Sequence, residues 1–61
     1  MTIVFKRPHG FTFECKCESN YYSVTVKNNN TVLESNIQMK TLKEFRDYVR
    51  AYMKEYYKTR S

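Results

Sequence analysis

A run of strictly alternating apolar and polar residues, "FTFECKCE", is the feature that most limits how this chain can fold. Apolar side chains fill every second position of the run: Phe11, Phe13, Cys15 and Cys17. Because successive side chains of a β-strand point to opposite faces, this period of two predicts a strand over about 11–18. We expect one face of that strand to be buried in the core and the other to meet solvent.

Two neighbouring segments also have the composition of strands. The apolar, β-branched run "TIVFK" predicts a strand over about 2–6. The segment "YYSVTVK" alternates again and predicts a strand over about 21–27. Its inward-facing side chains are expected to be Tyr22, Val24 and Val26.

A weaker pattern, "TVLESNI", predicts a fourth strand over about 31–37, with Leu33 and Ile37 directed inward. The segments between the strands have turn composition. "RPHG" has Pro and Gly at the second and fourth positions, which favours a type I turn. "SN" suits a two-residue hairpin loop, and "NNN" predicts the third turn, because Asn tolerates a positive φ.

The C-terminal third, "TLKEFRDYVRAYMKEYYKTR", predicts a helix over about 41–59, since no Gly or Pro interrupts it. Thr41 and Glu44 have the T-x-x-E spacing of a capping box, in which each side chain satisfies the other's backbone N–H. At about 100° per residue, one apolar face collects five side chains: Leu42, Phe45, Val49, Met53 and Tyr56.

These elements predict one small α+β domain over residues 1–61. We expect a four-stranded antiparallel sheet with one C-terminal helix packed on one face, in the order ββββα. A chain this short buries little surface on folding, so its stability depends on large side chains. Aromatic residues make up 16% of the sequence, and each ring removes about 150–250 Å² from water.

The N-terminus, "MTIVFKRPHG", has an apolar start that is too short for a secretory signal. No segment approaches the length of a membrane span, so a membrane partner is not expected. These observations predict a cytoplasmic protein.

The sequence contains little of the machinery that catalysis needs. Its one imidazole, His9, is expected in an exposed turn. Glu14 and Glu18 share the outer face of one predicted strand with Lys16, and Lys27 is expected nearby, which favours a solvated charge lattice over an acid/base pair. The single Gly excludes a glycine-rich phosphate loop. We therefore expect a protein that is not an enzyme and has no cofactor.

Two thiols, Cys15 and Cys17, face the same side of the predicted strand and offer two zinc ligands. The chain has no second Cys or His pair to complete a set of four, and residues two apart on a strand are poorly placed for a disulfide. The favoured interpretation is a pair of core thiols, so no metal site is predicted. A metal shared across a dimer is the alternative.

Positive charge is concentrated in the last third of the chain. Residues 1–39 contain four basic and three acidic residues, whereas residues 40–61 contain seven basic and three acidic residues. Four of the cations recur at every fourth position of the predicted helix: Arg46, Arg50, Lys54 and Lys58. Each like-charge pair at this spacing costs about 0.2–0.5 kcal/mol. The ladder spans roughly 18 Å in steps of about 6 Å.

We consider two explanations for this basic face: a solvated helix back, or a surface for an anionic partner. Of such partners nucleic acid is ranked first, with phosphates held by cations and an aromatic ring beside them. The residues expected to bind are Lys43, Arg46, Arg50, Lys54, Tyr57 and Lys58.

A protein-interaction module, or a modulator or inhibitor of another macromolecule, is the second functional hypothesis. It would use the same helix against an acidic protein surface, or the edge formed by Tyr48 and Tyr52. These two rings are expected either to seal the margin of the core or to contact a protein, including a second copy in a homodimer. The short chain rich in Lys, Asn and Tyr resembles small phage accessory proteins in composition.

Overall fold

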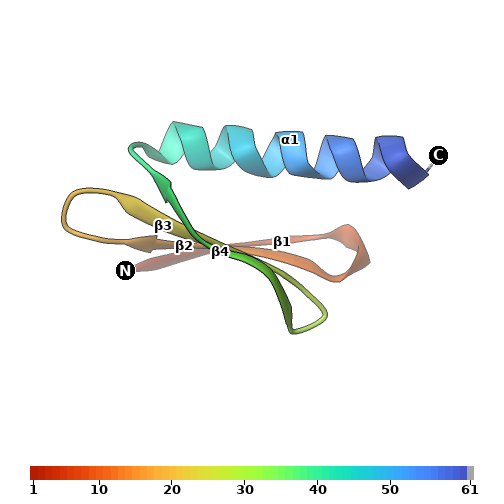
Figure 1. Cartoon of the computed structure of the whole chain (residues 1–61), viewed down its shortest axis with the longest axis horizontal. Coiled ribbons are helices and arrows are strands. Elements are labelled where there is room, and N and C mark those ends of the chain that lie inside the picture. Colours follow the sequence, from red (N-terminus) through yellow and green to blue (C-terminus); the bar gives the residue numbers. More distant parts are fainter. Residues whose placement is uncertain (61) are drawn as a thin grey trace.

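The computed structural model describes the backbone of residues 1–60 and the side chains of residues 1–59. Four strands precede one long helix along the chain (Figure 1). The elements are β1 (Thr2–Arg7), β2 (Phe11–Cys17), β3 (Tyr22–Asn28), β4 (Thr31–Met39) and α1 (Leu42–Arg60).

The strands form one antiparallel sheet in the spatial order β1-β2-β3-β4, so each strand pairs with its neighbour in sequence. Helix α1 forms a second layer over one face of this twisted sheet (Figure 1). The predicted α+β class and the order ββββα are therefore confirmed. An open sheet with one covered face needs the alternation seen in β2 and β3, because only one side of each strand meets the helix.

The turn between β3 and β4 has the backbone that its asparagines favour. Asn29 and Asn30 have φ values of 50° and 71°, and the flanking Asn28 and Thr31 are paired across the hairpin. Two successive positive φ angles define a type I′ connection, whose twist matches that of the strands.

The turn between β1 and β2 differs from the type I turn predicted from "RPHG". The short 3-10 segment η1 (Pro8–Gly10) contains His9 at φ 67° and ψ 25°, whereas a type I turn has φ near −90° at that position. Contacts to the end of β3 and to the β3–β4 turn hold this turn. The Asn28 side-chain amide donates to the His9 carbonyl oxygen at 3.0 Å, and the Asn29 N–H donates to the Gly10 carbonyl oxygen at 3.1 Å.

The core lies between the sheet and α1 and is aromatic at its centre. Phe13 from β2 is completely buried, and Phe45 from α1 is 1% exposed. The side chains that the sequence placed on the inner faces of β2, β3 and the helix supply most of it: Phe11, Phe13, Cys15, Val24, Val26, Met39, Phe45, Val49 and Met53. The period of two in β2 and β3 and the period of 3.6 in α1 thus predicted most of the core.

The two thiols of β2 do not share one environment, so the prediction of a pair of core thiols is wrong for one of them. Cys15 is buried, whereas Cys17 is exposed. The β2–β3 hairpin extends beyond the first turn of α1, which leaves this end of the sheet uncovered (Figure 1). Leu42, expected on the buried helix face, is 39% exposed.

Strand β4 departs from simple alternation. Val24 pairs with Ile37, Val26 pairs with Glu34, and the register shifts on both sides of Val26. Asn36, within the first irregularity, has a φ of 57°. Extra residues in one strand of a pair re-aim its side chains. Leu33, predicted to face inward, lies on the side of β4 that faces α1 but is 45% exposed.

The helix begins close to the capping box predicted for it, with one difference. The Glu44 N–H donates to Thr41 Oγ1 at 3.2 Å, as the motif requires. The Glu44 carboxylate accepts a hydrogen bond at 3.3 Å from the N–H of Lys40, one residue before the expected donor. The carboxylate also lies in the first turn, where negative charge suits the helix dipole.

Candidate nucleic-acid interface

The outward side of α1 carries the basic residues that the sequence singled out. Every member of the predicted set is exposed to solvent, which is the first requirement for contact with a partner. The set is Lys43, Arg46, Arg50, Lys54, Tyr57 and Lys58.

The protein's own carboxylates leave most of this charge unneutralised. The two ion pairs between described residues lie on the sheet, Lys16 with Glu18 at 3.9 Å and Lys27 with Glu14 at 3.2 Å. They form the solvated charge lattice predicted for its outer face. Within residues 1–59, no carboxylate lies at salt-bridge distance from the cations of α1 between Lys43 and Lys54.

A groove runs between one flank of α1 and the end of β1, with a volume of about 520 Å³. We call it the cationic groove and define it by six of its lining residues: Phe5, Arg7, Arg46, Arg50, Lys54 and Tyr57. It has four cations and no acidic residue in its lining. Three of these cations come from the helical ladder, and Arg7 comes from the other layer of the fold.

Local contacts fix the position of Arg7. Its guanidinium carbon lies 5.0 Å from the centroid of the Phe5 ring, and its Nη1 donates to the Lys6 carbonyl oxygen at 3.1 Å. A guanidinium over an aromatic face is attracted by the ring quadrupole. Phe5 in turn lies against Phe45 of the core, with ring centroids 5.1 Å apart. The positive charge of Arg7 is thus held against Phe5, a ring that packs on the core.

Three aromatic rings meet beside the cationic groove, and we call them the ring cluster: His9, Tyr56 and Tyr57. The His9 ring lies 5.6 Å from Tyr56 and 5.7 Å from Tyr57, and the two tyrosine rings are 5.6 Å apart. Tyr56 also contacts the buried Phe11 edge-to-face at 4.7 Å. The cluster therefore joins the β1–β2 turn to the last turns of α1.

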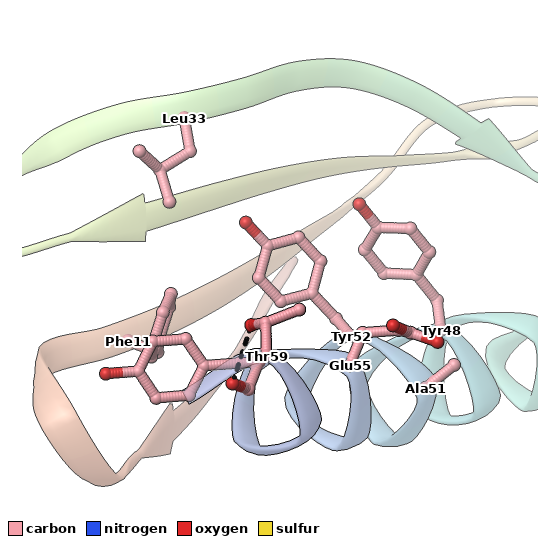
Figure 2. Close-up of a pocket in the computed structure, with 8 residues that line it drawn as sticks. Phe11, Leu33, Tyr48, Ala51, Tyr52, Glu55 and Thr59 are labelled. Atoms are coloured by element: carbon pink, nitrogen blue, oxygen red, sulfur yellow. Dashed lines mark hydrogen bonds between the residues drawn. The ribbon is translucent and has the colours of Figure 1, made fainter. Parts of the chain in front are cut away.

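The opposite flank of α1 has a different character. A groove of about 580 Å³ lies between the helix and β4, and its lining is mainly apolar and aromatic (Figure 2). We call it the tyrosine groove and define it by Phe11, Leu33, Tyr48, Tyr52 and Glu55. It is open because β4 curves away from α1 toward the β3–β4 turn (Figure 1).

Tyr48 and Tyr52 pack at the margin of the core and also line the tyrosine groove. Each ring is half-buried and packs edge-to-face on Phe13, with centroids 6.5 Å and 5.4 Å away. Their hydroxyls point toward the strand that carries Leu33 (Figure 2). Burial and the hydrogen bond from Tyr48 to Glu34 raise the pKa of the Tyr48 phenol to about 12. The two rings seal the core margin and also form one wall of an open groove.

The structure gathers only part of the predicted binding set into the cationic groove. Lys43 and Lys58 are exposed but do not line it. Arg7 and Phe5 do line it, and sequence reasoning missed both. Their approach to the helix depends on which flank of α1 meets β1. The sequence held one partial signal, because Phe5 and Arg7 are two residues apart in a predicted strand and so share one of its faces.

The described residues contain no group of three or more His, Cys, Asp or Glu side chains placed to hold a metal ion. Within residues 1–60, α1 is too polar to cross a membrane. No protein-family model matches the chain, and comparisons with curated proteins and with solved structures found no significant match.

Proposed function

We propose that this protein is a non-enzymatic nucleic-acid-binding module that holds phosphates in the cationic groove and along the basic side of α1. One observation carries the proposal. Arg7, Arg46, Arg50 and Lys54, from two different layers of the fold, line a single groove whose lining contains no acidic residue. A groove lined by one sign of charge concentrates counter-ions of the opposite sign.

The energetics of the free protein favour an anionic partner. The pairs Arg46–Arg50 and Arg50–Lys54 each cost about 0.2–0.5 kcal/mol on an exposed helix. A polyanion bound along them replaces this repulsion with attraction and releases its own condensed counterions. The step of about 6 Å along the ladder is comparable with the distance between successive phosphates of a strand. Arginine also suits phosphate oxygens because its planar fork donates two parallel hydrogen bonds.

Charge reversal combined with a salt titration tests the proposal. Binding of a labelled oligonucleotide is measured by fluorescence anisotropy for the wild type, Arg50→Glu and Lys16→Glu. Neutralising four phosphates gives a slope of log K against log[salt] of about −3.6 for a duplex and about −2.8 for a single strand. We expect Arg50→Glu to weaken binding by at least about tenfold and to reduce the slope. Lys16→Glu makes the same charge change on the outer sheet face, so it serves as the matched control and should have a much smaller effect.

Two results would contradict this function. One is the absence of any binding tighter than millimolar at low salt. The other is an affinity that does not change with salt, or that falls equally in Arg50→Glu and Lys16→Glu, since either would mean that the cationic groove is not the site.

The tyrosine groove favours a second candidate function, a protein-interaction module. Its apolar lining is bordered by Glu55, and Glu34 lies beside it at the Tyr48 hydroxyl. An apolar segment flanked by basic side chains complements this combination in both shape and charge. Aromatic side chains at such sites often contribute most of the binding energy.

A peptide with two leucines between lysines is a suitable probe, and a peptide with the same leucines between glutamates is its control. If the groove accepts a protein segment, Tyr52→Ala weakens binding of the lysine peptide, and the glutamate peptide binds less tightly. Equal binding of the two peptides, or no loss in Tyr52→Ala, would remove this candidate.

A further inference from the structure

We infer that the cationic groove receives single-stranded rather than duplex nucleic acid, with one base stacked on Tyr57 beside His9. The inference rests on the nucleic-acid-binding function proposed above and deepens it. It comes from the ring cluster, which the phosphate contacts alone do not explain.

Tyr57 belongs to both features. It lines the cationic groove together with Arg50 and Lys54, and its side chain is 45% exposed. Its edge contact with His9 leaves it the most accessible aromatic ring of the groove, because Phe5 is half-buried beneath Arg7. Cations that hold a backbone, with an accessible ring beside them, are the combination by which proteins bind single strands.

The backbone around His9 prepares the cluster for binding. His9 has a left-handed conformation, which is uncommon for a residue other than Gly and persists only where the surrounding structure holds it. Hydrogen bonds from Asn28 and Asn29 hold the turn, as described above. On the other side, Tyr56 is fixed against Phe11. Rings that are already in place lose less conformational freedom when a base stacks on them.

The location of the cations argues against a duplex. In a duplex the faces of the bases are covered by their neighbours, so an aromatic side chain cannot stack on them without unstacking a step. Proteins that read a duplex with a helix place a projecting helix surface into the major groove. Here Arg7 and Arg50 line a recess between two layers, with Tyr57 in the same lining. A single strand offers both a backbone that can enter the recess and a free base face for the ring.

A comparison of two probes tests the inference. Anisotropy is measured with a labelled oligothymidylate and with a duplex of the same length. We expect the single strand to bind more tightly, and Tyr57→Ala to weaken its binding by about 5- to 100-fold. Binding of the duplex should change little in the same variant. Tyr21→Ala is the matched control, because Tyr21 is 37% exposed and lies in the β2–β3 turn, away from the groove.

A spectroscopic reporter gives a second readout that a purely structural role would not move. The sequence contains no Trp, so Tyr57→Trp introduces a single indole at the proposed stacking position. Oligothymidylate should quench its fluorescence with the same midpoint as the anisotropy titration. Tyr21→Trp should remain unquenched.

The possible outcomes separate the inference from the function on which it rests. Equal binding of duplex and single strand, with no loss in Tyr57→Ala and no quenching of Tyr57→Trp, overturns the single-strand inference and leaves the nucleic-acid function in place. Binding of neither probe, or binding that is unaffected by Arg50→Glu, overturns both. Preferential binding of the single strand that depends on Tyr57 and on Arg50 supports both.

Discussion

The hydroxyl of Tyr48 donates a hydrogen bond to Glu34 Oε2 at 3.0 Å and so connects the helix to the edge strand β4. The contact exists because the irregular register of β4 places Glu34 opposite the buried Val26, on the side of the sheet that faces α1. If the side chains of β4 alternated regularly with Leu33 facing inward, the Glu34 carboxylate would lie on the outer face of the sheet. The Tyr48–Glu34 hydrogen bond lies at the edge of the tyrosine groove, where α1 and β4 are still in contact.

Burial of the Tyr48 phenol, together with its hydrogen bond to Glu34, predicts a loss of stability in alkali. The pKa of Tyr48 is raised to about 12 in the folded protein, whereas an unfolded tyrosine titrates near 10. The stabilising contribution is therefore complete below pH about 10 and is lost as the pH rises toward about 12. Urea unfolding of the wild type and Tyr48→Phe at a series of pH values measures this difference.

At neutral pH, Tyr48→Phe should lower the free energy of unfolding by only about 0.5 kcal/mol, because the acceptor is exposed. The gap between the two proteins should close in strong alkali. Tyr21→Phe, which removes an exposed hydroxyl elsewhere, is the control. A gap that is constant across the pH series would contradict the raised pKa of the Tyr48 phenol.

The two thiols of β2 should behave differently in the native protein. Cys15 is 1% exposed, and burial together with the nearby Cys17 raises the pKa of its thiol, so it should react slowly with an alkylating reagent. Cys17 is exposed and should react at once. Mass spectrometry of the partly labelled protein distinguishes the two sites.

Substitution gives the matching stability test for these thiols. Cys15→Ser places a hydroxyl in the core without a designed partner and should cost about 1–3 kcal/mol. Cys17→Ser should remain within about 0.5 kcal/mol of the wild type. Equal labelling rates, or equal costs for the two substitutions, would mean that both thiols share one environment.

The β1–β2 turn couples stability to binding. Gly10 has a φ of +83°, and a Cβ at this position would collide with the side chain of Asn29. Gly10→Ala should therefore destabilise the protein by about 1–3 kcal/mol. It should also weaken binding of a single strand, because the displaced turn carries His9 away from Tyr57.

The control for Gly10→Ala is Asn30→Gly in the β3–β4 turn. Asn30 also has a positive φ, at 71°, which Gly adopts without strain, so this change should leave stability and binding nearly unaltered. Thermal unfolding and anisotropy are measured for both variants in conditions where each is folded. A Gly10→Ala protein as stable as the wild type would contradict the described turn.

The sequence was sufficient to predict the order of the elements and most of the core. Alternation in β2 and β3 identified Phe13 and Val24 as buried, and a period of 3.6 identified Phe45, because one-sided burial imposes these periods. Where alternation failed, in β4, the cause was an irregular register around Asn36 that the polar run "ESN" does not reveal. Pairing register depends on the partner strand as well as on the residues themselves.

The candidate interface was predictable only in part. The spacing of Arg46, Arg50 and Lys54 along one helix face follows from the sequence alone. The contribution of Arg7 and of the His9 ring does not, because it depends on how the helix lies on the sheet and on a backbone conformation that a type I turn lacks. Packing brings together residues that are distant in sequence, and local sequence patterns do not show which residues will meet.

Nuclear magnetic resonance of the isotope-labelled protein tests the central claim most directly. A short oligothymidylate is titrated into the protein while the side-chain Nε–Hε signals of Arg7, Arg46 and Arg50 and the backbone signals of residues 7–10 are followed. The account predicts that these signals shift together and saturate, whereas the backbone signals of residues 31–37 in β4 stay in place. Arginine signals that remain unchanged while those of β4 or the outer sheet face move would contradict it.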